Sequence, residues 1–385
     1  MNSISHNFYD VVIVGSGPAG TACALALKDS GLKVAVLDKH QFPRDKVCGD
    51  AIPSRVPKVL KSISPEIADE IKSFEKKVNV RGCRVVAPNL KYIDIFFTLE
   101  GYISTRLDFD NRMAEVMKKI SKAVFLENHA VADVIMGKEE VEIVTEKNIS
   151  FRAKLVIGCD GAHSIIEKKL IAAKMDPRHY TGAVRAYYKN IADTANDVME
   201  IHLLKEYPAA YFWIFPLLNK TANVGFGMLS ENISKHKINL RKSLTDIITN
   251  HPALSIRFKH AQPLDEITGF GLPMGSRRVK ISGSRFMLCG DAASLIDPAT
   301  GEGIGNAMLS GKLAAEQAIK CFEQNNFSEN FMSGYGSALF RLIGKELKTK
   351  YLIQRLIGNR PWLANAAVTL AAKNNWVKKR MQKMF

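Results

Sequence analysis

The N-terminal part of the chain combines unbroken apolar runs with a helix-forming stretch. Residues 9–15 form an apolar run, the pattern of a parallel strand that is buried on both faces. Residues 21–28 favour a helix that ends near Gly31, and KVAVLDK at 33–39 predicts a second buried strand. This order predicts a strand–helix–strand unit of about 30 residues.

Later segments follow a different pattern. Alternating segments between 76 and 106, and aromatic-rich runs between 175 and 275, predict an antiparallel sheet with one helix near 239–249. Buried-strand character returns at 285–293, and helices are expected from there to the C-terminus. The chain is therefore predicted to begin one domain, leave it for a second sheet, and return late to complete the first.

Composition places the chain among folded globular proteins, at 46% hydrophobic and 24% charged residues. No run approaches the roughly 18 apolar residues of a membrane span, and the N-terminus lacks a secretory pattern. The six cysteines show no metal-binding spacing. We therefore expect reduced thiols, no metal site and a cytoplasmic location.

The net charge of +16 is concentrated near the C-terminus, where residues 341–385 contain eleven Lys or Arg and one acidic residue. Aromatic and aliphatic residues are interleaved with these charges. Such a region is typical of a helix that packs by its apolar side and exposes a basic face, or of one that lies on an anionic membrane. No nucleic-acid-binding motif accompanies the charge, so a nucleic-acid partner is not expected.

Three glycines follow the first predicted strand. Gly15 allows a tight turn, Gly17 lets the backbone approach phosphate oxygens, and Gly20 lets the following helix pack closely. The helix start at Pro18 and Ala19 would present free N–H groups to an anion. Asp38 ends the second strand, 18 residues after Gly20, where a carboxylate accepts hydrogen bonds from ribose hydroxyls. Together these features predict a dinucleotide site that Lys39 would adjoin.

The sequence resembles FAD-dependent oxidoreductases of the para-hydroxybenzoate hydroxylase type, and among them the geranylgeranyl reductase family. The resemblance covers nearly the whole chain and rests on five stretches in family order: KVCGD at 46–50, STRLDFD at 104–110, GCDGAHS at 158–164, AYFWIFP at 210–216 and CGDAASLIDPATGEGIGNAM at 289–308. It implies an α/β fold with an α+β insert. A Rossmann-like FAD-binding domain of GR2 type would carry an antiparallel substrate sheet and C-terminal helices.

The resemblance also implies domain boundaries and cofactor contacts. The FAD-binding domain would comprise 1–75, 102–174 and 276–330, the substrate domain 76–101 and 175–275, and a basic helical region 331–385. Beyond the glycine turn, Asp38 and Lys39, the expected FAD-binding residues are Cys48, Gly49, Arg106, Asp160, Gly161, Gly290, Asp291, Pro298, Gly301, Gly303 and Ile304. For Arg106, a surface ion pair with Asp108 or Asp110 is the alternative.

Four residues are candidates for the chemistry. Lys46 is expected to lower the pKa of the Cys48 thiol. The resemblance implies that both residues lie beside the flavin. Tyr211 and Trp213 share one face of a strand. The resemblance implies that this strand lines the cavity of a long apolar substrate, although aromatic strands also occur as plain core.

The implied reaction is reduction of carbon–carbon double bonds in an isoprenoid- or polyene-like substrate. Alternatives are an aromatic hydroxylase or halogenase, and a flavin electron-transfer protein without a small-molecule substrate. AYFWIFP has one of the two tryptophans of the usual halogenase motif, and the arginine that usually follows GCDGAHS is absent, which weakens direct NADPH binding. The electron donor would be NADPH or an acidic, ferredoxin-like protein.

Overall fold

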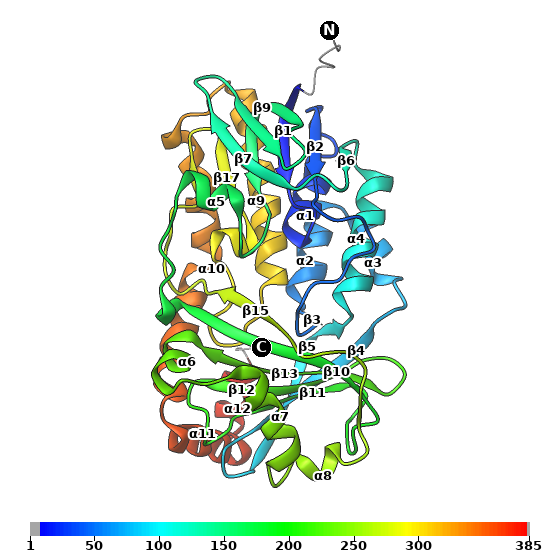
Figure 1. Ribbon diagram of the computed structural model, residues 1–385, viewed down its shortest axis with the longest axis vertical. Coiled ribbons are helices and arrows are strands. Elements are labelled where there is room, and N and C mark those ends of the chain that lie inside the picture. The colour runs from blue at the N-terminus through cyan, green and yellow to red at the C-terminus, as the bar shows by residue number, and fades with distance from the viewer. Residues whose placement is uncertain (1–7, 383–385) are drawn as a thin grey trace.

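Two β-sheets lie one below the other along the long axis of the molecule (Figure 1). The computed structural model describes residues 8–382. The upper sheet in Figure 1 begins with the N-terminal strand, and the lower sheet contains the segments that the sequence pattern assigned to a second layer. The predicted α/β class with an α+β insert is confirmed.

The first sheet has the order β16-β17-β9-β1-β2-β6, with β8 paired to β9 and β7 to β8. Its strands are β1 (Phe8–Val14), β2 (Val34–Leu37), β6 (Val124–Leu126), β7 (Val131–Met136), β8 (Val141–Thr145), β9 (Ser150–Gly158), β16 (Ser282–Gly283) and β17 (Phe286–Leu288). β1 runs parallel to both β2 and β9, and β17 runs parallel to β9. The carboxyl ends of these strands therefore meet at one edge, where ligands bind in open α/β sheets.

The second sheet has the order β14-β10-β13-β12-β11-β4-β5-β3, with β15 also paired to β10. Its strands are β3 (Ala51–Ile52), β4 (Val78–Val86), β5 (Tyr92–Ile103), β10 (Tyr180–Lys189), β11 (Val198–His202), β12 (Ala210–Pro216), β13 (Thr221–Leu229), β14 (Gln262–Pro263) and β15 (Thr268–Pro273). The sheet is not antiparallel throughout, because β4 and β11 pair in parallel. β4 and β11 lie in two segments that are far apart in the sequence, so the chain between them supplies the long connection that a parallel pair needs.

Helices connect and cover the sheets. They are α1 (Pro18–Ala26), α2 (Arg55–Ile63), α3 (Pro65–Lys72), α4 (Arg106–Ile120), α5 (Ile165–Leu170), α6 (Ser230–His236), α7 (Leu240–Asn250), α8 (Ser255–Phe258), α9 (Ile304–Glu323), α10 (Glu329–Gly358), α11 (Pro361–Lys373) and α12 (Asn375–Gln382), with 3₁₀ turns η1 (Pro177–His179) and η2 (Gly290–Ala293). Among residues 8–382, no helix is long and apolar enough to cross a membrane.

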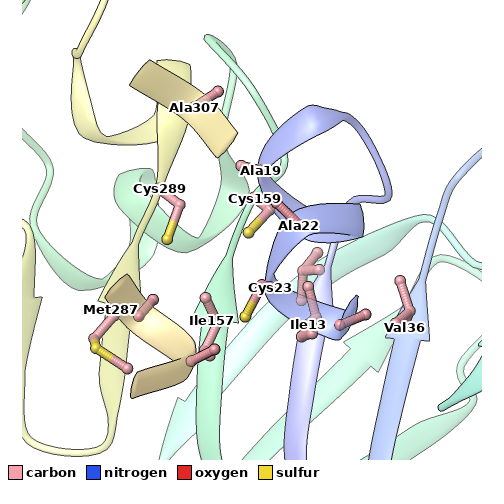
Figure 2. Packing of buried hydrophobic residues seen from close by; sticks show 14 of the residues in the cluster. Ile13, Ala19, Ala22, Cys23, Val36, Ile157, Cys159, Met287, Cys289 and Ala307 are labelled. Carbon is pink, nitrogen blue, oxygen red and sulfur yellow. The ribbon is translucent and has the colours of Figure 1, made fainter. Parts of the chain in front are cut away.

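Small side chains let α1 and α9 approach each other over the first sheet. Ala19, Cys23 and Ala307 lie between these helices and the strand ends that carry Cys159 and Cys289 (Figure 2). All five residues are buried. Close packing at this point sets the starts of α1 and α9 side by side at the carboxyl edge of the sheet.

The long helix α10 spans both layers (Figure 1). Residues of its first two thirds, including Tyr335 and Leu347, are buried in the core of the first sheet. Beyond it, Val368 and Ala371 of α11 pack on Cys83 and Ile95 of the second sheet. The prediction assigned residues 331–385 to a separate region. In the structure, the part of α10 with these buried residues packs on the first sheet instead. The domain boundaries as a whole stay a prediction.

Candidate active site between the two sheets

A cavity of about 1070 Å³ lies between the sheets. Its wall starts at Gly15 and Asp38 on the carboxyl edge of the first sheet. It passes Cys48 and Tyr211, and continues to Val368 and Met381 of the C-terminal helices. The cavity thus joins a polar region and an apolar region in one space.

The glycine turn has the geometry that the sequence predicted. Gly15 has φ +94°, and a Cβ there would lie 2.4 Å from Cys159 O. A Cβ on Gly20 would lie 1.9 Å from Gly15 O, so this glycine allows α1 to start against the strand. A Cβ on Gly17 would meet Arg44 Nη2 only at 3.8 Å. Gly17, Pro18 and Ala19 line the cavity, whereas Gly20 lies behind the turn.

Asp38 is 5% exposed and lines the cavity beside this turn. Its Oδ2 accepts hydrogen bonds from Ser16 N (2.8 Å) and Ser16 Oγ (2.7 Å), and its Oδ1 accepts from His40 N (2.9 Å). These bonds hold the carboxylate in place at the end of β2. Lys39 is exposed at the cavity rim.

Arg106 forms an ion pair with Asp110, but the pair is buried rather than on the surface. Arg106 Nε and Nη2 each lie 2.7 Å from an Asp110 oxygen, and Arg44 Nη1 lies 2.6 Å from Oδ2. Burial raises the pKa of Asp110, but the attraction of Arg106 and Arg44 outweighs it and holds this pKa below its ordinary value. Arg106 and Arg44 both line the cavity, and Arg44 lies beside the glycine turn, with Nη2 3.8 Å from the place of a Cβ on Gly17.

The loop between β2 and β3 brings Lys46 and Cys48 to the cavity. Lys46 Nζ lies 2.9 Å from Asp291 Oδ2 and 5.3 Å from the centre of the Phe270 ring. Asp291 therefore has a lysine partner that the sequence did not predict. The expected lowering of the Cys48 pKa is wrong in sign, because burial raises the pKa of this thiol by more than Arg106 and Lys46 lower it.

Asp50, at the end of the same loop, was not among the predicted site residues. It is fully buried and has φ +65°, a conformation that is uncommon outside glycine. Its Oδ2 accepts hydrogen bonds from Tyr187 Oη (2.7 Å) and Asn223 Nδ2 (2.8 Å), and Oδ1 accepts from Arg106 N (3.3 Å). Burial raises the pKa of Asp50 to about 6 despite these donors. The sequence did offer a signal for it, because Asp50 is the last residue of the KVCGD stretch at 46–50.

Tyr211 and Trp213 of β12 both line the cavity, while Phe212 and Ile214 enter the core on the other face. Tyr211 Oη donates to Thr300 O at 2.6 Å. Trp213 Nε1 donates to Asn223 Oδ1 at 2.9 Å. Their polar atoms thus hold the cavity wall together, and a direct role in chemistry stays a prediction.

The turn before α9 borders the same cavity as the glycine turn. Gly301 has φ +73°. Asp297 Oδ1 accepts from Ala299 N (2.9 Å) and Thr300 N (3.1 Å), and Asp297 Oδ2 lies 2.5 Å from Lys350 Nζ. The predicted residues of this segment, Gly290, Asp291, Pro298, Gly301, Gly303 and Ile304, all line the cavity. Glu302, which the prediction left out, lines it as well.

Asp160 and Gly161 follow β9 and also line the cavity. Asp160 accepts hydrogen bonds from Ser164 Oγ (2.5 Å) and Ile165 N (2.7 Å), so its carboxylate caps α5. Apart from Gly20, every predicted cofactor residue therefore borders one cavity. Open backbone at Gly17, a carboxylate at Asp38 and a second glycine turn on the same cavity are features that fit FAD.

The fold and site define an FAD-binding oxidoreductase. The FAD binding domain family matches residues 8–315 of the chain. The chain is 30% identical over 378 residues to digeranylgeranylglycerophospholipid reductase of Thermoplasma acidophilum, covering 94% of this chain and 88% of that protein. It is 31% identical over 365 residues to the protein of that name from Methanococcus vannielii, with 91% and 88% covered. The protein belongs to the digeranylgeranylglycerophospholipid reductase family, as the resemblance predicted.

A solved structure supports the fold independently. A geranylgeranyl bacteriochlorophyll reductase-like protein from Thermoplasma acidophilum matches with a TM-score of 0.83 at 24% identity, covering 98% of this chain and 99% of that chain. The same arrangement of two sheets therefore occurs in both molecules.

Proposed function

We propose that this protein reduces carbon–carbon double bonds of an isoprenoid lipid with electrons from bound FAD. The observation that carries the proposal is the continuity of the cavity between the glycine turns and an apolar chamber. The second sheet and the C-terminal helices form the walls of this chamber. The lining side chains there are Val85, Phe97, Met199, Ile201, Leu203, Ile353, Ile357, Ala364, Val368 and Met381. A long hydrocarbon chain would be bound there by burial of apolar surface.

FAD would be held by the two glycine turns. Gly17 and the N-terminus of α1 would bind the diphosphate, and Asp38 would bind ribose hydroxyls. Asp291, Gly301 and the start of α9 would adjoin the flavin ring. Bound FAD supplies hydride transfer in such enzymes. These assignments are supported by the placement of the residues on one cavity wall.

The chain's own residues would align the double bond and exclude water from it. Trp213 and Phe215 pack on Gly49, where a Cβ would lie 3.4 Å from the Phe215 ring. Tyr211 holds the α9 turn through Thr300. The aromatic strand β12 would thus join the cofactor region to the substrate chamber.

The test is anaerobic turnover. FAD-loaded protein is reduced chemically in the absence of oxygen and mixed with a lipid that bears geranylgeranyl chains. The masses of the products are measured by mass spectrometry. We expect a gain of one pair of hydrogen atoms per reduced bond, and none with a saturated lipid. A product that forms only in air and contains added oxygen would indicate a hydroxylase. Rapid electron exchange without any lipid product would indicate an electron-transfer protein.

The electron donor is NADPH or an acidic, ferredoxin-like protein. The net charge of +16 favours a protein donor, because opposite charge accelerates encounter. Stopped-flow reduction of bound FAD by each donor distinguishes them, and only reduction by an acidic protein should slow strongly with added salt.

The C-terminal helices would lie on the cytoplasmic face of an anionic membrane. Exposed apolar residues lie on them near basic ones, among them Leu352, Leu356, Trp362 and Trp376. The Arg380 guanidinium lies 5.0 Å from the centre of the Trp376 ring. This combination is typical of surface-bound helices.

Vesicle sedimentation tests the membrane proposal. We expect binding to vesicles that contain phosphatidylglycerol, weaker binding to pure phosphatidylcholine, and loss of binding in the double variant Trp362→Ser, Trp376→Ser. The matched control is Ile256→Ser, at a side chain on α8 that is 75% exposed. Equal binding of both variants would contradict the proposal.

A further inference from the structure

Glu302 lies in the turn before α9, between Gly301 and Gly303, and lines the cavity. Its Oε1 accepts a hydrogen bond from Gly305 N at 2.6 Å, in the first turn of α9. Within residues 8–382 this is the one hydrogen bond that the carboxyl group forms. Oε2 is therefore left for a group in the cavity.

Four other carboxylates on this wall already accept hydrogen bonds or pair with a lysine. Both Asp38 oxygens accept hydrogen bonds from Ser16 or His40, and both Asp50 oxygens accept from neighbouring donors. Asp160 caps α5, and Asp291 pairs with Lys46. Glu302 differs from Asp38, Asp50 and Asp160 because one of its oxygens accepts no hydrogen bond within residues 8–382, and it differs from Asp291, whose Oδ1 is likewise without one, because no cation is paired with it.

A network of charged groups lies near Glu302. Asp297 and the cations Arg55 and Lys350 act on its carboxyl group electrostatically. Lys350 Nζ lies 2.5 Å from Asp297 Oδ2 and 2.9 Å from Glu346 Oε1, and Arg55 Nη2 lies 2.6 Å from Glu346 Oε2. The Glu346 side chain is 36% exposed. The ion pairs thus extend from Asp297, in the same turn as Glu302, to the partly exposed Glu346.

The protonation state of Glu302 changes near neutral pH. Burial raises its pKa to about 7, and the like charge of Asp297 adds to this effect, while the Gly305 amide, Arg55 and Lys350 oppose it. A carboxyl group of this kind holds a proton at neutral pH and is able to release it.

We propose that Glu302 is the acid that supplies the proton consumed when a substrate double bond is reduced. This inference rests on the proposed function. One alkene carbon accepts a hydride, which the reduced cofactor loses as it is oxidised. The O–H bond of Glu302 breaks, its proton forms a C–H bond at the neighbouring carbon, and the π bond is lost. Glu302 is left as a carboxylate and regains a proton through Lys350 and Glu346.

The first test needs no lipid. Midpoint potentials of bound FAD are measured as a function of pH in wild type, Glu302→Gln and Glu302→Asp. Negative charge on the reduced cofactor should raise the proton affinity of Glu302, so reduction takes up one extra proton above about pH 7. The wild-type potential should therefore fall more steeply there than that of Glu302→Gln, by about 30 mV per pH unit for a two-electron couple. Glu302→Asp should keep part of the difference.

The matched control is Glu323→Gln, an exposed position at the end of the same helix, which should behave as wild type. Turnover with lipid should fall about 100-fold or more in Glu302→Gln and lose the wild-type decline above about pH 7. Identical potential slopes in wild type and Glu302→Gln would overturn the role of Glu302. A slope difference without any lipid reduction would instead overturn the proposed function, because protonation of Glu302 would then be linked to flavin reduction but not to reduction of a lipid.

Discussion

Asn223 and Asp50 are joined by a buried hydrogen bond of 2.8 Å that links the second sheet to the loop carrying Cys48. The same Asn223 amide donates to the Cys48 carbonyl at 2.7 Å, and its oxygen accepts from Trp213. One side chain of β13 therefore fixes the loop and the aromatic strand together. Both segments line the cavity, so this link sets the shape of the wall between cofactor and substrate regions.

Asn223→Ala should loosen this wall. Two buried acceptors lose their donor, which should lower the free energy of unfolding by about 2 kcal/mol. Cys48 should also react faster with a thiol reagent. Denaturant unfolding and the labelling rate are the measurements, with Asn250→Ala, an exposed position at the end of α7, as control. Equal labelling rates in both variants would contradict the prediction.

Asp50 should make stability depend on pH. Its folded pKa of about 6 exceeds that of an unfolded aspartate, so the folded chain binds more protons between about pH 4 and pH 6. The free energy of unfolding should therefore fall as pH rises through this interval, by about 3 kcal/mol relative to Asp50→Asn. Denaturant titrations at several pH values measure this difference. A constant difference between the two proteins would show that Asp50 does not titrate there.

Asp110→Ala should be among the most destabilising single changes in α4. It leaves Arg106, which is 3% exposed, without its carboxylate and removes the partner of Arg44. A loss of about 3–5 kcal/mol is expected for breaking a buried pair. Glu115→Ala, which removes a surface partner of Arg112 on the same helix, should cost less than about 1 kcal/mol. Unfolding curves that shift equally would refute the comparison.

Asp38→Ala should weaken FAD binding at least about tenfold, because hydrogen bonds to a charged acceptor contribute about 1.5–3 kcal/mol. Titration of apoprotein with FAD, followed by flavin fluorescence, gives the dissociation constant. Asp29→Ala is the control, since the Asp29 side chain is 80% exposed and lies outside the cavity wall. Unchanged affinity in Asp38→Ala would remove Asp38 from the proposed cofactor site.

Ala367→Trp should close the apolar chamber without disturbing FAD. Ala367 lines the cavity on the face of α11 that also carries Ala364 and Val368. Lipid reduction should fall by about tenfold or more, because the larger side chain occupies space that the hydrocarbon needs. Leu370→Trp, at an outward position on α11 that is 57% exposed, should retain activity. Full activity of Ala367→Trp would place the substrate elsewhere.

Much of the fold was predictable because short sequence patterns reflect the requirements of single strands, turns and helix starts. Each of these patterns is required by one strand end or one helix start: the apolar run before Gly15, the glycine spacing and the acidic residue at position 38. Those segments occupy the predicted places. The parallel pairing of β4 with β11 was not predictable in this way, since it depends on which separate excursions of the chain become neighbours.

The sequence by itself determined the strand–helix–strand unit, the two glycine turns and the family of the protein, because these depend on residues close together in the chain. Only the tertiary structure decided how Lys46 pairs with Asp291, how Asn223 holds Asp50, and that Glu302 faces the cavity with one oxygen unoccupied. The raised pKa values of Cys48 and Asp50 belong to the same group. They arise from burial between two sheets, and burial depends on packing between segments far apart in sequence.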